Sequence, residues 1–336
     1  MVFRFGSRLS LTAFAAAALL LGPVSGALAA EPADDGILTF QFENDLFGNK
    51  DGHFTHGTRI AWMSPENSVP EWVRNAAGHV PLFDARASKR IVWSLGQSMY
   101  TPEDISRADP DPNDRPYGGW TYIGIGLVSV DNEQLDNLEL NIGMVGPASG
   151  AGAVHRAWHD AFGFPEPRGW DHQIGNEPGI NLIYDRKWRN FHRFDIVGLE
   201  VDATPNAGVA LGNVFTHAQA GLTVRLGQDL PADYGPPRIR PSLPGSDYFM
   251  PERAFGWYLF AGVTGRAVAR DIFLDGNTFA DSPSVDKRPF VGDFQMGFAV
   301  SFGDVRLAYT HILRTREFEG QGESDQFGSL SISARF

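Results

Sequence analysis

Oxygen-bearing side chains gather in one short part of the chain, FQFENDLFGNKDGHFTHGTRIAW, which runs from Phe40 to Trp62. They are Glu43, Asn44, Asp45, Asp51 and Thr55. Carboxylate, amide and backbone oxygens are the ligands of hard cations such as calcium, which takes about 6–8 oxygen atoms in a flexible geometry. Asp and Asn also cap the backbone of tight turns with their own side chains. On composition alone the turn is the better explanation, and the metal site stays open as an alternative.

A second group of reactive side chains is a histidine pair in SGAGAVHRAWHDAFG, which begins at Ser149. Its apolar residues recur at helical spacing, with a serine for a cap and Gly163 as a stop. His155 and His159 then share one helix face, because they are four residues apart. HRAWH resembles half of a zinc site but lacks the glutamate of zinc proteases. Spacing alone favours two surface histidines, and a single general base stays open.

The segment DRPYGGW, from Asp114 to Trp120, combines an ion-pair candidate with residues that shape a bend. We expect Asp114 and Arg115 to form an ion pair that fixes a loop, which is an architectural role. The chain contains no G-x-S-x-G nucleophile elbow. If the protein is a hydrolase, water activated by a base is therefore the simpler nucleophile.

The first residues carry a targeting signal rather than part of the fold. Arg4 and Arg8 precede the apolar run LTAFAAAALLL, and the small-residue stretch ALAAEP follows it. This order of charge, apolar run and small residues is typical of a secretory signal peptide. We assign residues 1–29 to the signal peptide and residues 30–336 to one domain.

Composition excludes several classes of protein. The rest of the chain has no apolar run of about 18 residues, so helical membrane spans are not expected. With no Cys, neither disulfides nor thiolate metal sites are available. The net charge of −12 argues against a nucleic-acid partner. The 38 glycines and 12% aromatic residues suit many strands and turns with aromatic girdles, although a soluble β-protein can share them.

Apolar residues alternate with polar or small ones along much of the chain. The segments 137–146 (NLELNIGMVG) and 292–302 (GDFQMGFAVSF) both have period two. A soluble sandwich also alternates, but its polar face usually carries more Lys and Glu. The C-terminal GSLSISARF alternates too and ends in Phe336, like the last strand of bacterial outer-membrane barrels. We predict an all-β fold, a transmembrane antiparallel β-barrel of about 12 strands with a short helix in a surface loop.

The predicted strands place the reactive residues at one rim of this barrel. The strands are 37–43, 56–64, 90–99, 118–129, 136–146, 179–188, 193–204, 215–226, 255–274, 288–302, 304–314 and 327–336, the ninth being one long strand or a hairpin. If the N-terminus is periplasmic, the surface connections lie near 44–55, 100–117, 147–178, 205–214, 275–287 and 315–326. The stretches 65–89 and 227–254 are then periplasmic. Asn44, Asp45, Thr55 and His159 would all lie at the outer rim.

Four ordered motifs resemble the LpxR-type lipid A 3′-O-deacylase family of Gram-negative outer membranes. They are ENDLF…HFTHGTRIAW, GQSMYTPEDI…DRPYGGW, VGPASG…H-x-x-x-G and GWDHQIGNEPG, and the resemblance covers about 37–190. It implies a twelve-stranded barrel that removes the 3′-linked acyloxyacyl group of lipid A with calcium. In such an enzyme a helix-borne His activates water, while calcium polarises the ester carbonyl and steadies the oxyanion.

The resemblance also implies roles for individual residues. Asn44 and Asp45 match the family's Asn-Asp pair, with Asp45 as the calcium ligand. Thr55 matches a hydroxyl residue of the family's site, with Phe54 before it in place of Tyr. His159, four residues before Gly163, matches the catalytic base.

Three positions depart from the family pattern. His155 stands where the resemblance implies Gln. Glu166 is the candidate for the family's acidic residue, and Arg107 is the nearest candidate for its basic residue. The roles of these three residues stay open.

We therefore expect a monomeric outer-membrane ester hydrolase whose active site faces the cell surface. Its substrate is lipid A or lipopolysaccharide in the outer-membrane bilayer, and its cofactor is calcium. One alternative is a non-catalytic barrel, either a porin or a structural protein. The other is a phospholipase-like esterase acting on glycerophospholipid. The sequence leaves open the acyl chain, the regioselectivity and whether activity is latent in the native membrane.

Overall fold

The computed structural model describes residues 35–48, 52–79, 83–84, 86–131, 133–189, 191–239 and 246–336. The predicted signal peptide, residues 1–29, lies outside this part of the chain. Among the described residues, no helix combines the length and the apolar character needed to cross a membrane.

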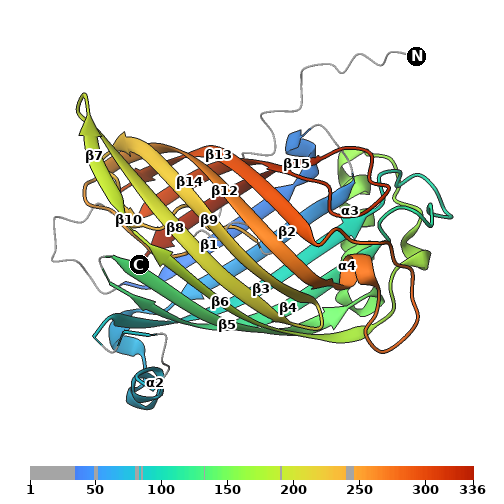
Figure 1. The fold of residues 1–336 in the computed structure, drawn as a ribbon, viewed down its shortest axis with the longest axis horizontal. Coiled ribbons are helices and arrows are strands. Elements are labelled where there is room, and N and C mark those ends of the chain that lie inside the picture. Colours follow the sequence, from blue (N-terminus) through green and yellow to red (C-terminus); the bar gives the residue numbers. More distant parts are fainter. Residues whose placement is uncertain are drawn as a thin grey trace. The chain divides into compact units, whose positions relative to one another are not determined.

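Twelve antiparallel strands close into a barrel (Figure 1). In chain order they are β1 (Ile37–Asn44), β2 (His53–Met63), β3 (Ser88–Thr101), β4 (Gly118–Val130), β5 (Gln134–Val145), β6 (Glu177–Trp188), β8 (Leu199–Gly212), β9 (Phe215–Gln228), β12 (Phe255–Asp271), β13 (Phe290–Phe302), β14 (Val305–Arg314) and β15 (Asp325–Arg335). The ring closes because β1 pairs with β15 and β6 pairs with β8. This confirms the predicted fold class and strand number.

The remaining elements lie in the connections. They are η2 (Asp45–Gly48), η3 (Glu66–Ser68), α2 (Glu71–Ala77), η4 (Pro147–Ser149), α3 (Ala151–Phe162), η5 (Trp170–His172), β7 (His192–Ile196), β10 (Ala232–Asp233), β11 (Phe249–Met250) and α4 (Ile272–Asp275). The predicted loop helix is α3. The long strand predicted at 255–274 is the single strand β12, followed directly by α4. We call the end of the barrel that carries α3 and α4 the α3 end.

Alternation divides each strand between the lipid-facing wall and the lumen. Along β1, Leu38 and Phe40 are exposed on the outside, whereas Thr39, Gln41 and Glu43 are buried. This is the reverse of a soluble protein, whose apolar residues are buried. An apolar outer wall around a polar interior is the arrangement of a membrane-spanning barrel.

Charged residues from the segment after β9 fill part of the lumen. Arg306 of the wall contacts the Asp233 carboxylate at 2.8 Å, and Arg238 contacts Glu43 at 2.6 Å. Further along the segment, Asp247 lies 3.0 Å from Arg59. The expectation that 227–254 lies in the periplasm is therefore wrong for these residues. Buried charges require partners, and the lumen-facing arginines supply them.

The strand predicted at 193–204 and the connection predicted at 205–214 also differ from the structure. β7 continues β6 alongside β8, and the hairpin turns at Val197 and Gly198, whose φ angles are +51° and +82°. One strand at 193–204 and a surface connection at 205–214 are thus wrong, because β8 runs to Gly212. A β-branched residue rarely adopts positive φ, so the sequence gives little sign of this turn.

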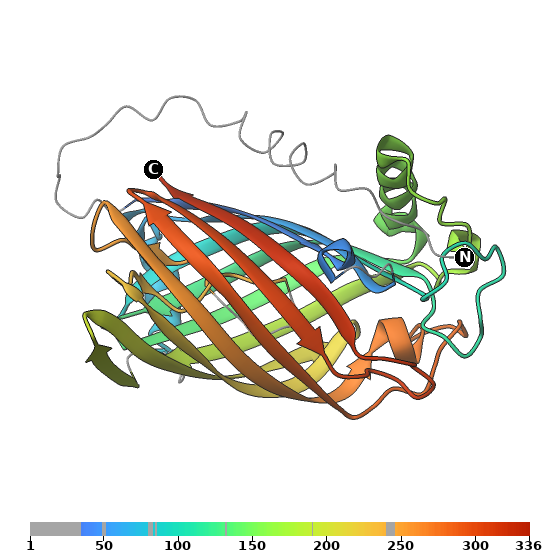
Figure 2. The same cartoon turned by 90° about the horizontal axis from the view of Figure 1, so that it is seen from above.

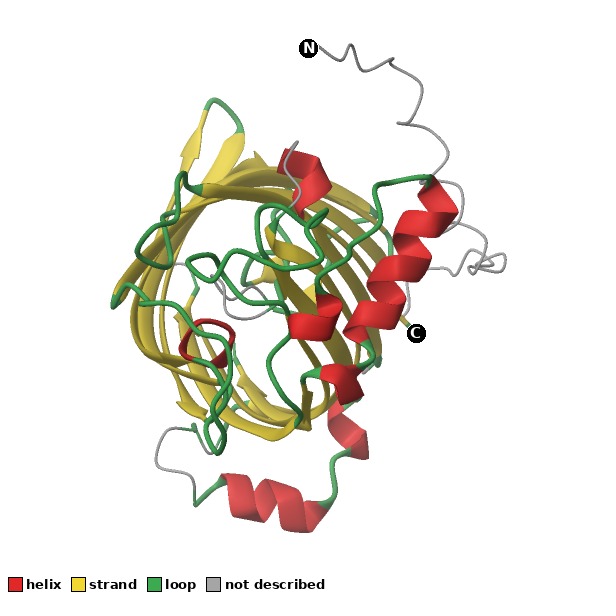
Figure 3. Cartoon of the chain, turned by 90° about the vertical axis from the view of Figure 1, so that its right-hand side faces the viewer, coloured by secondary structure: helices red, strands yellow, loops and turns green. Residues whose placement is uncertain are grey.

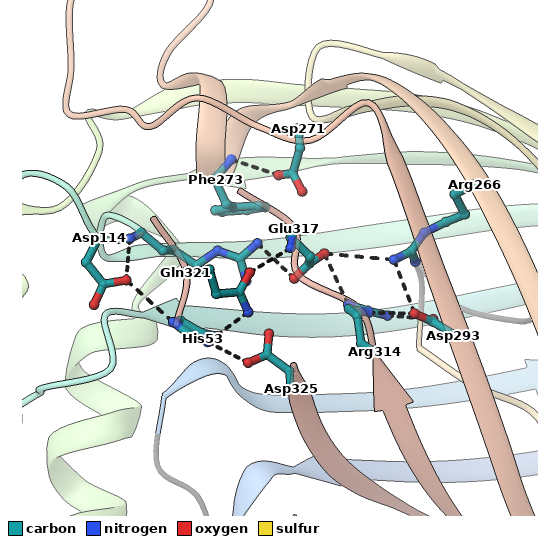
Figure 4. A network of polar contacts seen from close by, with 11 residues as sticks. His53, Asp114, Arg266, Asp271, Phe273, Asp293, Arg314, Glu317, Gln321 and Asp325 are labelled. Carbon is teal, nitrogen blue, oxygen red and sulfur yellow. Dashed lines mark hydrogen bonds and ion pairs between the residues drawn. The ribbon is translucent and has the colours of Figure 1, made fainter. Parts of the chain in front are cut away.

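Loops at the α3 end are joined by the polar network of Figure 4. The His53 ring lies between the carboxylates of Asp325 (2.5 Å) and Asp114 (3.4 Å). Arg115 is fully buried and lies 3.0 Å from Glu317. The predicted ion pair between Asp114 and Arg115 is therefore wrong, although the segment does connect loops. Burial opposes ionisation of Asp114, but the hydrogen bond to His53 lowers the pKa of its carboxyl group.

Candidate active site

Helix α3 lies outside the ring of strands, along the wall formed by the first strands of the barrel (Figures 2 and 3). Gly150 and Gly163 flank it in left-handed conformations. Side-chain groups of Gln97 and Thr121 donate to the carbonyl oxygen of Ser149, at 2.9 and 2.7 Å, and so hold the start of the helix. These contacts fix α3 against the lipid-facing side of β3 and β4.

One glycine of the wall makes this close approach possible. A Cβ on Gly119 of β4 would lie 2.1 Å from the Cβ of Ala151 and 2.5 Å from Oγ of Ser149. Any side chain at this position would push α3 away from the wall. The glycine is therefore a steric requirement of the site.

The same face of the wall continues under α3 to β1 and β2. The Trp158 ring of α3 lies 5.6 Å from the Phe42 ring and 6.0 Å from the His56 ring, between centroids. His56 is paired with Asn44 across the β1–β2 ladder. Helix α3 thus covers the outer face next to the β1–β2 hairpin tip.

Asn44, Asp45 and Thr55 are brought together at this tip. Asn44 donates from Nδ2 to the Thr55 carbonyl oxygen at 2.8 Å. Asp45 accepts the Gly52 N–H at 2.7 Å, and the Thr55 hydroxyl lies 2.7 Å from that of Thr101. The three predicted side chains are at most 4% exposed. Backbone capping and a buried oxygen cluster therefore occur in the same turn.

The other acidic residues of the sequence cluster do not join this group. The Glu43 side chain points into the lumen, where Arg238 binds it. Asp51 lies outside the described residues. Asp45 is therefore the carboxylate that the described hairpin tip contributes to this group.

The two histidines of α3 form a directed chain of hydrogen bonds. Trp170 must donate from Nε1, and it lies 3.0 Å from Nδ1 of His155. Pro165 offers a carbonyl oxygen, which must accept, 2.5 Å from Nδ1 of His159. The two histidine Nε2 atoms lie 2.9 Å apart. With both rings neutral, His155 therefore donates from Nε2 to Nε2 of His159, and His159 donates from Nδ1 to Pro165.

Burial keeps His155 uncharged. Loss of water around its ring, together with nearby His159, His56 and Arg156, lowers the pKa of His155 to about 3. At neutral pH His155 is thus a neutral donor. The lone pair on Nε2 of His159 is the one that can accept a proton. In this structure it accepts the hydrogen bond from Nε2 of His155.

The site residues form two groups rather than one contact network. The polar contacts of the His159 side chain within the described chain are with His155 and Pro165. The hairpin-tip group of Asn44, Asp45 and Thr55 is adjacent through the packing of Trp158 on Phe42 and His56. Both groups lie on the same part of the outer wall.

A calcium ion fits the donor set of the hairpin tip by its chemistry. The described residues contain no cluster of three or more His, Cys, Asp or Glu side chains able to hold a metal ion. The tip instead offers one buried carboxylate, an amide oxygen, a hydroxyl and backbone carbonyls. This all-oxygen set suits a hard cation and not zinc.

Two of the residues at which the chain departs from the family pattern, Glu166 and Arg107, make none of the contacts described above. Glu166 is exposed, in the loop after α3. Arg107 is tied to its own loop, since Nε donates to the Asp109 carbonyl oxygen at 3.1 Å and Nη1 lies 3.5 Å from Asp111. Neither residue is placed in the site by a recorded contact.

Sequence reasoning missed the contacts made by His56 and Trp170. Both residues stand inside the quoted motifs, His56 in HFTHG and Trp170 in GWDHQ. Their presence there was the available signal. Trp170 lies outside the helix that carries His155, so the spacing of the two residues in the sequence does not predict their contact. Only the fold brings the two rings together.

The fold and the site together define an outer-membrane β-barrel protein with a buried histidine pair against its lipid-facing wall. The family model described as "Outer membrane protein LpxR" matches residues 11–336. The chain belongs to the LpxR family, and its location is the outer membrane.

One solved structure supports the fold. "LpxR from Salmonella typhimurium" is similar with a TM-score of 0.71 and 20% identity, over 89% of this chain and 100% of that one. The β-domain of the Bordetella autotransporter BrkA gives a TM-score of 0.42 at 9% identity, over 90% of this chain and 97% of that one. No curated protein matches the chain.

Proposed function

We propose that this protein is a lipid A deacylase that hydrolyses the 3′-acyloxyacyl ester of lipid A or lipopolysaccharide. The observation that carries the proposal is the buried pair of His155 and His159, held by α3 against the lipid-facing wall. The adjacent group of Asn44, Asp45 and Thr55 supports it. Membership of the LpxR family supports a lipid A deacylase of the outer membrane.

His159 is the proposed general base. Its Nδ1–H bond to the Pro165 carbonyl oxygen fixes Nε2 as the atom that accepts a proton. Water that replaces His155 at Nε2 gives up a proton there, and the hydroxide attacks the ester carbonyl carbon. When the tetrahedral intermediate collapses, Nε2 returns the proton to the departing sugar oxygen. The base is then restored, and the products are the acyloxyacyl carboxylic acid and the free 3′-hydroxyl group of the sugar.

Asp45, with backbone oxygens, would hold calcium, and Asn44 and Thr55 would give polar support. A calcium ion bound there supplies a positive charge that stabilises an oxyanion. The side chains of the tip act on its geometry. Asn44 ties β1 to Thr55, and Asp45 ties the turn at Gly52, so the oxygen atoms are held in place before substrate arrives.

The surroundings of the site suit a substrate that comes from the bilayer. Leu46 and Phe47 beside the tip, and Val154 and Phe162 of α3, are all exposed apolar residues. They give acyl chains a surface that is continuous with the lipid-facing wall. We therefore propose that the α3 end faces the cell surface, where lipopolysaccharide forms the outer leaflet. All residues invoked come from one chain, so we propose that the enzyme works as a monomer.

The lumen argues against the porin alternative. Asp233, Arg238 and Asp247 bring ion pairs into the interior, where they occupy part of the lumen. The phospholipase-like alternative uses the same base and water, so substrate analysis must separate it.

The decisive experiment is mass spectrometry of lipid A from membranes that contain the wild type or His159→Ala, with calcium or with chelator. We expect the wild type with calcium to release the 3′ acyloxyacyl unit. His159→Ala should be slower by about 10²–10⁴-fold, because it lacks the base. The matched control is His192→Ala, an exposed histidine of β7.

Three outcomes bear on the proposal. Unchanged lipid A with folded wild-type barrel would contradict the deacylase. Fatty acid released from phospholipid vesicles instead would favour the phospholipase. Activity that survives chelation would remove calcium from the mechanism while leaving the base in place.

A further inference from the structure

A groove lies on a part of the outer wall that α3 does not cover. It is formed by β9, β12 and β13, the near wall at the α3 end in Figure 1. Its volume is about 900 Å³. The strands β5, β6 and β8 separate it from β4, and β14 and β15 separate it from β1. The groove is therefore distinct from the candidate active site.

Small side chains form the floor of the groove. One cross-strand row consists of Ala220, Gly265 and Gly292, and the next row consists of Ala218, Ala267 and Phe290. Paired residues of a sheet point to the same face, so both rows share the outer wall. The row on the other side is larger and consists of Leu222, Val263 and Phe294. The hollow thus follows from residue size along three adjacent strands.

The space above this floor is open. A Cβ built on Gly265 has no other atom within 4 Å. The large ring of Phe290 is 75% exposed at one side of the groove. The groove is therefore apolar, and the side chains of the barrel leave it unfilled.

Two arginines line the groove where it meets the loops. Arg316 is exposed and forms no ion pair within the described chain, and Arg288 contacts Glu319 at 2.8 Å. That carboxylate is itself 63% exposed, and such surface pairs contribute about 0–1 kcal/mol. Thr315, next to Arg316, accepts the Gly292 N–H at 2.9 Å, which ties this loop to the floor. Both arginines thus lie at the loop side of an apolar groove.

We propose that this groove binds a phosphorylated glycolipid of the lipid A class, which is held there and not hydrolysed. Acyl chains would occupy the space above the glycine and alanine rows. The two arginines at the loop side of the groove match phosphates, which guanidinium groups bind in bidentate fashion. Three strands span about 10 Å between the outer two, which suits a head group wider than that of a phospholipid. The inference rests on the proposed orientation of the α3 end toward the cell surface, and it does not depend on the hydrolytic reaction.

The test is native mass spectrometry of the barrel from detergent micelles. The probes are bisphosphorylated lipid A, dephosphorylated lipid A and phosphatidylglycerol, each added separately. All variants carry His159→Ala, so that no probe is consumed. We expect Gly265→Trp to lower the retained bisphosphorylated lipid A by about one copy per barrel. The matched control is Ala261→Trp, on the same strand and face but outside the groove lining.

The arginines give a second, independent variant. Arg288→Gln combined with Arg316→Gln should abolish the preference for bisphosphorylated over dephosphorylated lipid A. This variant decides the question if Gly265→Trp fails to fold, which heat-modifiable migration on gels reveals. Equal retention of phosphatidylglycerol, or retention unchanged by either variant, would overturn the proposal. With His159 intact, Gly265→Trp should hydrolyse lipid A at the wild-type rate, which separates this groove from the proposed active site.

Discussion

At the scale of single residues, the direction of one hydrogen bond assigns the two histidines different tasks. Trp170 can only donate, so His155 receives that bond at Nδ1 and presents Nε2–H to His159. His159 is left with its basic atom at Nε2. His155 is accordingly a positioning residue, and His159 is the proposed catalytic residue.

His155→Gln and His155→Leu should therefore differ. Glutamine can accept from Trp170 and donate to His159, so kcat should stay within about threefold of the wild type. Leucine leaves a buried Trp N–H unsatisfied, at a cost of about 1–3 kcal/mol, and should lower kcat by about tenfold. The check is kcat and KM on lipid A across pH. Equal kcat for both variants would contradict the positioning role. A merely structural role of His155 would leave the pH dependence of kcat unchanged.

The pKa of His155 predicts how α3 responds to acid. Because folding lowers this pKa from about 6.5 to about 3, the unfolded segment binds the proton more tightly. The contribution of neutral His155 to the stability of the folded helix is fully present above about pH 6.5. It is lost as the pH falls toward 3. At pH 4 the loss is about 3 kcal/mol.

Hydrogen exchange of peptides covering 151–162, corrected for intrinsic rates, measures this opening. Protection in the wild type should fall between pH 6.5 and pH 4. His155→Gln, which has no titrating ring, is the control and should fall less. A wild type and variant with the same pH dependence would contradict the assignment.

At the scale of elements, the site depends on how close α3 can come to the wall. The contacts of Ser149 with Gln97 and Thr121 position the first turn of the helix. The close contact of Gly119 with Ala151 then sets the distance. The strand and the helix thus build the site jointly, and neither does so alone.

Gly119→Leu should abolish deacylation while the barrel still forms. The new side chain would overlap Ala151 and displace α3, taking the histidine pair from the hairpin tip. The measurement combines lipid A mass spectrometry with heat-modifiable migration of the folded barrel. The control is Gly265→Ala, whose Cβ meets no atom within 4 Å and which should keep full activity. Normal activity of a folded Gly119→Leu protein would argue against α3 as part of the site.

At the scale of the whole molecule, charges inside the lumen link the segment after β9 to distant strands. Asp233 is fully buried and contacts Arg225, Arg306 and the Tyr258 hydroxyl. These partners come from three different strands of the wall. The luminal segment thus stabilises the barrel and narrows its interior.

Asp233→Ala should destabilise the barrel by about 3–5 kcal/mol, because it leaves buried guanidinium groups without their partner. The free energy of unfolding by urea in detergent micelles measures this effect. Asp304→Ala is the control, since Asp304 is exposed and its pair with Arg335 at 3.3 Å should contribute less than about 1 kcal/mol. Equal stability of the two variants would show that the luminal contacts contribute little.

Local patterns in the sequence determined the architecture and the family. Period-two alternation specifies a strand with one apolar face, and its recurrence predicts the barrel and nearly all of its strands. The motif order predicts the family, and the family model confirms it. Such patterns work because neighbours in a strand or helix have a fixed geometry.

Only the tertiary structure decided which oxygen-bearing side chains point to the same face of the wall and which groups contact the two histidines. Glu43 and Asn44 are adjacent, yet one points into the lumen toward Arg238 and the other lies on the outer wall. Trp170 reaches His155, and Asp233 enters the lumen, through contacts between segments with no shared periodicity. Val197 shifts one strand boundary by adopting a positive φ angle, which is rare for a β-branched residue. The physical reason is that long-range partners are selected by burial and charge in the closed barrel, and local sequence spacing does not encode them.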